Sequence, residues 1–208
     1  MKRLENVEFS ISECTTELKQ FEELLNNNDD LQEKRDILPF FKQRKQLSCF
    51  LASYLVGIEK GNKFAHEYPF FGDFSCDLIS HNSTRDKYLL IEFEDATKNS
   101  IFQRNGNKDT LEWGNRFEHG YSQIIDWLWK LDDMKQTGDY RTKFSDSCEF
   151  YGMLIIGRDK YLEPKEIDRL NWRRQKVIVN SRQVFCLTYD EIFYILKNRM
   201  DFYRDLAG

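Results

Sequence analysis

Hydrophobic residues recur every three to four positions between residues 13 and 25, which predicts an amphipathic helix. A polar break over residues 26–30 separates this helix from a second, short one over 31–41. Pro39 interrupts the helical pattern of that second segment. The next stretch, residues 46–55, is apolar enough to form a buried helix. The first quarter of the chain is therefore predicted to be helical.

The pattern changes to that of a β-hairpin over residues 70–94. The first strand is predicted to end at Asp77, and a polar turn follows it. The second strand contains an apolar run over 88–91, followed by Glu92 and Glu94 at alternate positions. Because strand residues i and i+2 face the same way, we expect these two glutamates to lie side by side.

The second half of the chain alternates between helical and strand patterns. The expected elements are a loop over 95–110, a helix over 112–131, a polar loop over 138–146, a strand over 150–156, a helix over 164–175, strands over 176–180 and 184–187, and a helix over 191–203 capped by Asp190. Helices, a hairpin and then alternating helices and strands predict an α/β fold with a mixed β-sheet and helices on both faces.

The 208 residues suit one domain behind a short extension. We expect an N-terminal extension over residues 1–12 and a single domain over 13–208. Within that domain, residues 13–62 form a helical lead-in and residues 63–208 the α/β core. With 40% hydrophobic residues, 17 Phe and 10 Tyr, the chain can bury a large core.

Charge and cysteine content restrict the possible functions. The net charge of −4 means that contact with a polyanion has to be local. Five cysteines without CxxC spacing argue against a disulfide framework or a zinc ribbon, and they fit a reducing cytoplasm. No apolar run approaches the roughly 18 residues that span a bilayer. We therefore expect a cytoplasmic protein without membrane contact.

The carboxylates of Asp77, Glu92 and Glu94 are the strongest candidates for chemistry. At the end of an apolar hairpin they repel one another and lose solvation, and a bound cation relieves both penalties. Hard oxygen ligands suit Mg²⁺ or Mn²⁺. Asp73 competes with Asp77 for the role of first acid. Glu67 could add a ligand, although a surface role is its simpler interpretation.

Other catalytic machinery is not indicated by the sequence. There is no GxSxG motif and no Cys/His arrangement for a nucleophile, and no GxxxxGK[ST] loop for nucleotide phosphates. His66, His81 and His119 lack metal-ligand spacing and are interpreted as surface or packing residues.

The order of the acidic motifs is typical of a known fold. An acid on one strand, Asp77, is followed by the tripeptide Glu92-Phe-Glu94 at the end of an apolar strand and by Gln123 on a helix. This order resembles the PD-(D/E)xK pattern. The resemblance implies a restriction-endonuclease-like mixed β-sheet core flanked by helices.

Later segments narrow the resemblance to one family. The sequences YSQIIDW (121–127) and MLIIGRD (153–159), followed by KVIVN and LTYDEI, resemble the nuclease domain of the Shedu anti-phage defence family. Each motif alone is weak, and their order and spacing carry the resemblance, which covers roughly residues 15–197.

The resemblance implies metal ligands at Asp77 and Glu92 and an accessory site residue at Gln123. Glu94 departs from the family pattern, which has lysine there. A lysine would orient the attacking water and offset negative charge, whereas a glutamate can bind metal or accept a proton. Lys98, in the loop beyond the strand, could swing back to supply that charge.

Basic residues elsewhere are candidates for binding the phosphates of DNA. They are Arg104, Lys108, Arg158, Arg173 and Arg174.

The sequence thus predicts a Mg²⁺- or Mn²⁺-dependent DNA endonuclease of a Shedu-type anti-phage system. We expect a homo-oligomer, with control by oligomerisation or by a regulatory partner protein. The alternative is a catalytically inactive nuclease-like module that binds nucleic acid or a protein, and Glu94 and the acidic net charge favour it.

Overall fold

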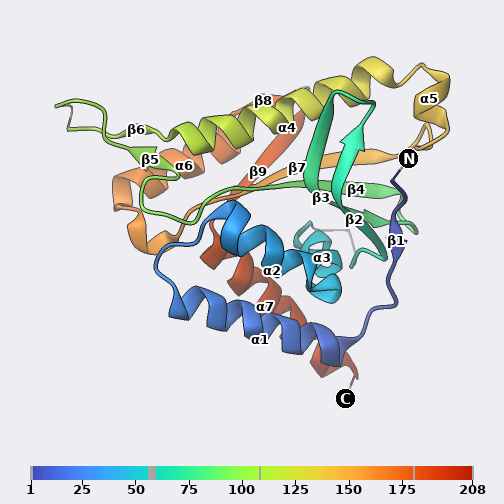
Figure 1. The fold of residues 1–208 in the computed structure, drawn as a ribbon, viewed down its shortest axis with the longest axis horizontal. Helices are drawn as coiled ribbons and strands as arrows, with labels where there is room; N and C mark the ends of the chain where they lie inside the picture. Colours follow the sequence, from blue (N-terminus) through green and yellow to red (C-terminus); the bar gives the residue numbers. More distant parts are fainter. Residues whose placement is uncertain (1, 56–59, 108, 180, 208) are drawn as a thin grey trace.

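The computed structural model describes residues 2–55, 60–107, 109–179 and 181–207, which form an α/β fold around a seven-stranded sheet (Figure 1). The sheet has the order β1 (Glu5–Asn6), β2 (Lys63–Phe70), β3 (Phe74–Asn82), β4 (Lys87–Phe93), β7 (Glu149–Ile155), β9 (Arg182–Leu187) and β8 (Ile178–Val179). A separate ribbon pairs β5 (Phe102–Gln103) with β6 (Glu112–Trp113). The helices are α1 (Ile11–Asn27), the π-helical turn η1 (Glu33–Ile37), α2 (Leu38–Lys42), α3 (Lys45–Phe50), the 3-10 turn η2 (Leu51–Tyr54), α4 (Asn115–Met134), α5 (Gly138–Arg141), the 3-10 turn η3 (Asp159–Tyr161), α6 (Pro164–Lys176) and α7 (Tyr189–Ala207). The predicted α/β class, with a mixed sheet between helices, is confirmed.

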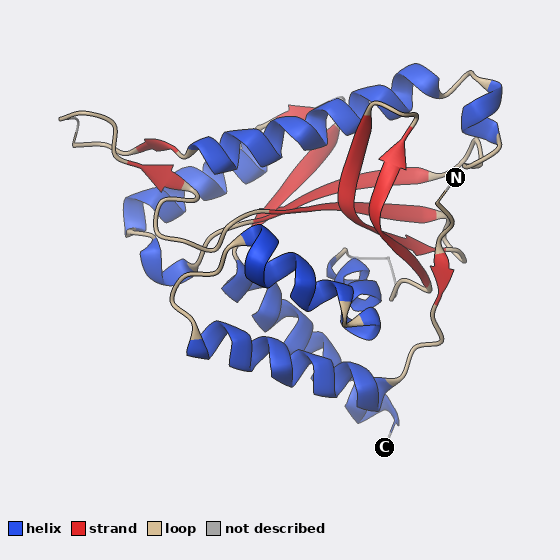
Figure 2. Ribbon diagram, viewed as in Figure 1, coloured by secondary structure: helices blue, strands red, loops and turns tan. Residues whose placement is uncertain are grey.

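Helices cover both faces of the sheet (Figure 2). Helices α4 and α6 lie on one face, and α1, α2, α3 and α7 lie on the other. Alternate residues of the central strands divide between the two layers. Leu90 and Leu154 pack beneath α4, whereas Ile91 and Met153 pack against the opposite helices. Burial on both faces explains why β4 and β7 are nearly continuous apolar runs in the sequence.

The sheet changes direction at β4. Its neighbour β3 is antiparallel, while β7 is parallel, and β9 continues the parallel part. The connections between parallel strands run through α4 and α6, and right-handed crossovers in one direction place both helices on the same face. Ligands of open α/β sheets bind beyond the carboxyl ends of parallel strands. The acids that follow β4 lie at that edge.

The hairpin is one strand larger than the sequence predicted. Residues 63–70 form β2 and pair with β3, and β3 continues to Asn82. Asp77 therefore lies within a strand, and the prediction that it ends one is wrong. Glu67 has a φ of +46°, which interrupts the regular alternation of side chains along β2. Strand prediction relies on that alternation, so the sequence pattern did not indicate this strand.

Three helix boundaries also differ. Pro39 stands in the first turn of α2, where its fixed φ is favourable, and does not interrupt a helix there. The predicted helix over 112–131 begins at Asn115, because the residues before it pair as β6. Thr188, and not Asp190, caps α7: its Oγ1 accepts from the Glu191 N–H at 3.0 Å.

Other predicted elements are shorter than expected. The strand over 176–180 is reduced to the two residues of β8, and Asn180 lies outside the described residues. The helix over 46–55 divides into α3 and the 3-10 turn η2. None of the described helices combines the length and apolarity needed to cross a membrane.

His66 gives the fold a testable dependence on pH. Both of its ring nitrogens are buried without a hydrogen-bond partner among the described residues. Burial, and then the nearby charge of Lys42, lowers its pKa from 6.5 to about 4. The unfolded chain therefore binds a proton at His66 near pH 6.5, whereas the folded chain binds it only near pH 4. Folding stability consequently falls as the pH decreases from 6.5 to 4.

We expect His66→Phe to reduce the loss of unfolding free energy between pH 7.5 and 5 by about 1–2 kcal/mol. Chemical denaturation at the two pH values measures this difference. The same substitution at the exposed His119 is the control. A pH dependence of His66→Phe equal to that of the unmodified protein contradicts the assignment.

Candidate functional site

Asp77 and Glu92 lie on the neighbouring strands β3 and β4. The antiparallel register ends at the pair Leu78 and Ile91, and Asp77 and Glu92 are the next residues on the two strands. The Phe93 N–H donates to Asp77 Oδ2 at 2.9 Å. Desolvation raises the pKa of Glu92, and the two carboxyl groups are close enough for the charge of Asp77 to raise it further. The structure thus brings together the two acids that the sequence analysis ranked first.

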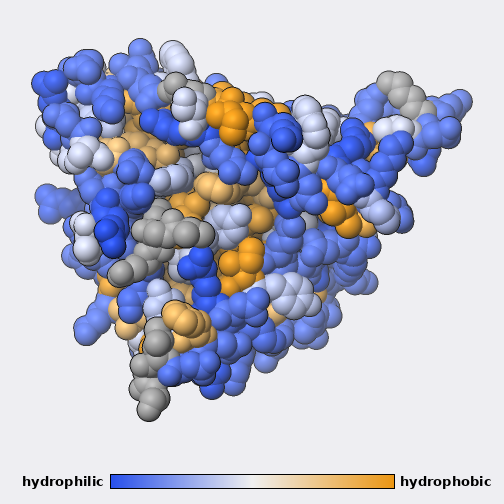
Figure 3. Space-filling view, turned by 180° about the vertical axis from the view of Figure 1, so that it is seen from behind, coloured by the Kyte–Doolittle hydropathy of each residue, from blue (hydrophilic) through white to orange (hydrophobic). Residues whose placement is uncertain are grey.

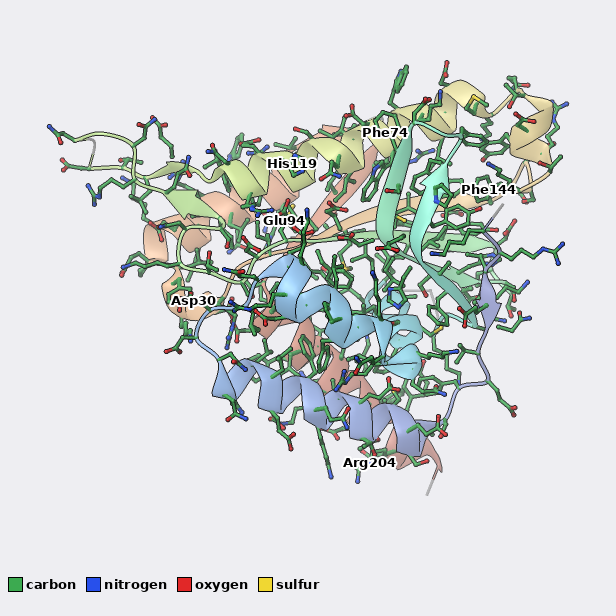
Figure 4. The ribbon with its side chains drawn as sticks, viewed as in Figure 1. Asp30, Phe74, Glu94, His119, Phe144 and Arg204 are labelled. Atoms are coloured by element: carbon green, nitrogen blue, oxygen red, sulfur yellow. The ribbon has the colours of Figure 1, made fainter. Side chains whose placement is uncertain are left out.

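Glu92 and Glu94 both point towards α4, as their alternate spacing predicts. They meet the helix at Gly120, where an added Cβ would lie 3.1 Å from Glu94 Cγ and 3.5 Å from Glu92 Cγ. Glycine therefore allows the close approach of α4 to the acids. Figure 4 shows Glu94 near the middle of the molecule, between the beginnings of α2 and α4.

Burial makes these carboxyl groups reluctant to ionise. Glu92 is 7% exposed and Glu94 only 1%. Desolvation, followed by the charges of Asp77 and Glu94, raises the pKa of Glu92 well above its ordinary value. The pKa of Asp77 is also raised, mainly by desolvation. Desolvation raises the pKa of Glu94 to about 7, although Arg116 opposes the shift. A cation bound here would be favoured by every one of these groups.

Arg116 is the cation that the protein itself places at the site. Its Nη1 lies 3.1 Å from Glu94 Oε2 and 3.1 Å from Glu33 Oε2, and its Nε lies 3.3 Å from Asp95 Oδ2. Asp95 also accepts the Glu33 N–H at 2.8 Å. We call Glu33, Glu94, Asp95 and Arg116 the arginine cluster. It joins α4, the end of β4 and the helical layer on the other face of the sheet.

Gln123 lies one heptad after Arg116 on α4, so the two share a helical face with Gly120. Its Oε1 is buried and has no hydrogen-bond partner among the described residues. An unpaired buried carbonyl is costly, and water or a ligand normally satisfies it. The predicted accessory residue is therefore on the helix face that meets the acids.

The donor chemistry fits a hard divalent cation held by few protein ligands. Across the described ranges, no three His, Cys, Asp or Glu side chains form a ready-made metal cage. Mg²⁺ does not need one, because it is usually bound through one or two carboxylates, with water and substrate phosphate completing the octahedron. Asp77 and Glu92 provide such a pair, with the free Gln123 oxygen on the neighbouring helix.

The remaining acidic candidates are farther from this arrangement. Asp73 precedes β3 and pairs with Lys130 at 2.6 Å, so it is not the first acid of the site. Glu67 is opposite Asp77 in register, but its side chain is 59% exposed and pairs with Lys42 at 2.7 Å. Its surface interpretation agrees with this position.

Most of the basic residues proposed to contact DNA have partners within the protein. Arg158 is 5% exposed, and it binds Asp190 and the carbonyl oxygens of Leu25 and Asn28. The structure therefore assigns it a role in holding the fold together, not one in binding phosphate.

The other members of that set differ in their surroundings. Arg173 binds Glu118 through two hydrogen bonds of 2.6 and 2.9 Å, and Arg174 binds Glu191. Arg104 is exposed in the connection between β5 and β6, which projects from the body of the molecule (Figure 1). Lys108 lies outside the described residues. Lys98 is exposed in the loop after β4.

Sequence reasoning missed Arg116 and Glu33. A signal for Arg116 existed, since a residue seven positions before Gln123 falls on the same helical face. For Glu33 there was none, because it reaches the site from a turn separated from β4 by more than fifty residues of chain. Only the packing of the first helices against the sheet brings it there.

Comparison with known proteins agrees with this architecture. A search of curated proteins finds no match to the chain. The family model for the Shedu protein SduA, C-terminal, matches residues 30–193. The match begins just before Glu33 and includes the acids on β3 and β4, all of α4, and the parallel strands. Since it covers well over half of the chain, the protein belongs to the Shedu SduA C-terminal family.

Proposed function

We propose that this protein is a metal-dependent DNA endonuclease that acts in Shedu-type anti-phage defence through a PD-(D/E)xK-type centre. The observation that carries the proposal is the pair Asp77 and Glu92. Glu92 is buried near the end of β4 and meets α4 at Gly120, and Asp77 lies beside it on β3, with its carboxylate held by the Phe93 N–H. Family membership supports the defence role, and the carboxylate pair supports the chemistry.

Asp77 and Glu92 are the residues that would hold Mg²⁺ or Mn²⁺, with Gln123 beside them. Such an ion, when bound, lowers the pKa of a coordinated water and polarises a phosphate oxygen. The protein's own contribution is orientation. The Phe93 N–H holds Asp77 in place, and the close approach of α4 at Gly120 leaves little room for side-chain motion of Glu92.

Arg116 supplies the positive charge that the lysine of the family pattern would provide. In the lysine's position stands Glu94, whose carboxylate receives the Arg116 guanidinium at 3.1 Å. Arg116 remains 48% exposed, so one side of its guanidinium can face an incoming phosphate. We assign it the role of stabilising negative charge on the scissile phosphate.

An inactive module that binds DNA or a protein is the second candidate. The observation that favours it is the same ion pair, since three carboxylates already surround the Arg116 side chain. In that case Asp77 and Glu92 would serve folding alone.

A plasmid-cleavage assay with matched aspartate variants separates the two candidates. We expect the unmodified protein to cleave DNA in Mg²⁺ or Mn²⁺ but not in EDTA. Asp77→Asn should lower the rate by at least about 100-fold, because it replaces one of the two charged ligands with a neutral amide. Asp73→Asn, four residues away and paired with Lys130, should leave the rate unchanged. Equal rates for the two variants contradict the proposal, and binding without cleavage in any metal favours the inactive module.

A further inference from the structure

A second concave site lies between α6 and β6, on the side of α4 that faces away from the acids. It is a cavity of about 360 Å³ lined by Trp113, Arg169, Trp172, Arg173 and Val177. We call it the tryptophan pocket. Its volume falls in the range of small-ligand sites. Four of its residues come from one face of α6 and its end, at spacings of three, one and four residues.

The walls of the pocket are aromatic rings and flat guanidinium groups. Trp113 is held rigidly, since its ring stacks on Phe102 at 4.5 Å and on Phe117 at 4.6 Å between centroids. Arg173 lies over the same ring at 4.7 Å, and Arg169 lies 5.4 Å from it. Such a wall is already organised to receive another flat group.

Trp172 also lines the pocket and is unusually exposed. Its exposure is 62%, and no aromatic or cationic group contacts its ring within the described part of the chain. Hydrophobic residues also gather beside the projecting β5–β6 ribbon and over β8, on a surface that is otherwise mostly hydrophilic (Figure 3). An exposed tryptophan beside an ordered aromatic stack is a surface that gains free energy from a stacking ligand.

The charges around the pocket favour an anionic ligand. Arg173 is neutralised by Glu118, whereas Arg169 donates to the Leu111 carbonyl at 2.7 Å. Among the described residues, no carboxylate pairs with Arg169. The pocket thus combines stacking surfaces with one uncompensated guanidinium. Aromatic stacking surfaces together with a positive charge are what proteins use to bind a nucleobase and its phosphate.

The pocket is mechanically connected to the acids through the first turns of α4. Glu118 binds Arg173 on one side of this helix, while Arg116, two residues earlier, binds Glu94 on the other. The two sites are therefore separated by about the 10 Å diameter of a helix. A DNA strand whose phosphate lies at the acids can place a base a few nucleotides away in the pocket.

We propose that the tryptophan pocket binds an unpaired base of a DNA strand by stacking it on Trp172, with Arg169 near its phosphate. The choice of DNA as the ligand rests on the proposed function, whereas the argument for a stacking ligand rests on the pocket's own geometry. A base inside a duplex is already stacked on its neighbours, so the pocket selects single-stranded or locally opened DNA.

Binding of a fluorescent oligo-thymidylate in EDTA tests the pocket without cleavage. An abasic strand of the same length keeps the phosphates but removes the bases. We expect the unmodified protein to bind the abasic strand about 10-fold more weakly, the scale of one base–aromatic stack. Trp172→Ala should bind oligo-thymidylate about 10-fold more weakly and no longer distinguish the two strands, while Trp172→Phe should keep most of the difference.

Trp129 is the matched control, because it is similarly exposed, at 58%, but lies on α4 away from the pocket. Trp129→Ala should behave like the unmodified protein. Equal binding of the two strands by the unmodified protein contradicts the proposal that the pocket binds a base. Unchanged binding of oligo-thymidylate by Trp172→Ala contradicts it as well. Cleavage in Mg²⁺, measured on the same preparations, keeps the two proposals apart. If the unmodified protein does not cleave DNA but Trp172→Ala loses base-dependent binding, the base-binding proposal is supported and the nuclease proposal is contradicted.

Discussion

Glu92→Gln is expected to lower metal-dependent cleavage by about 1000-fold or more, because it replaces a charged ligand with a neutral amide at the centre of the acid pair. The fold should tolerate the change. Burial raises the pKa of Glu92 so that the protonated acid is favoured without metal, and glutamine resembles that acid in shape and in its ability to donate a hydrogen bond. We therefore expect the unfolding free energy in EDTA to change by less than about 1 kcal/mol.

Two measurements are needed for Glu92→Gln. Mg²⁺ or Mn²⁺ should raise the melting temperature of the unmodified protein and leave that of the variant unchanged, since a bound ion stabilises only a chain that holds it. Glu149→Gln is the control, because Glu149 stands at the opposite end of the β4–β7 pair and is 54% exposed. Equal metal stabilisation of Glu92→Gln and the unmodified protein would place the ion elsewhere.

Arg116→Met should have the second largest effect, and it should act on both stability and rate. It leaves Glu33, Glu94 and Asp95 without their shared cation, although their side chains are only 13%, 1% and 16% exposed. Unpaired buried carboxylates are costly, so we expect a loss of about 2–3 kcal/mol of unfolding free energy at pH 8. The loss should shrink towards pH 5, because Glu94, with a pKa raised to about 7, can then take up a proton.

Arg116→Lys separates the catalytic from the structural contribution. A lysine restores the charge that the family pattern has at this site, so most of the stability should return, together with more than a tenth of the cleavage rate. Arg141→Met, at a 57% exposed arginine beside Asp146, should change neither quantity. Full cleavage by Arg116→Met would show that the arginine cluster serves folding alone.

The sequence predicted the placement of Glu92 and Glu94 better than the boundaries of the elements around them. Alternation placed Glu92 and Glu94 on one face, and the packing of Gly120 against both confirms it. The extent of the hairpin was misjudged because Glu67 adopts a positive φ, so β2 lacks the regular period on which strand prediction relies. Periodicity carries information about local structure, and a local irregularity removes it.

The sequence pattern did not reveal contacts between residues that are far apart along the chain. Arg158 lies after a buried strand with the appearance of a phosphate-binding residue, yet its guanidinium donates to the end of α1 and to Asp190. Nothing in the neighbouring sequence distinguishes a buried arginine from an exposed one. Its partners are more than a hundred residues away on one side and thirty-two on the other. Such contacts are decided by packing and not by spacing.

The same arginine has a consequence for synthesis of the protein. Arg158 connects the first long helix to the last, so its three partners cannot be complete until Asp190 has left the ribosome. Glu33 begins the turn η1, the element after the helix end that Arg158 holds, and it is one of the acids around Arg116. Until Asp190 has been synthesised, the end of the first helix therefore lacks the contact that ties it through Arg158 to the last helix. A chain that ends before α7 contains Asp77 and Glu92 but lacks the Asp190 partner of Arg158.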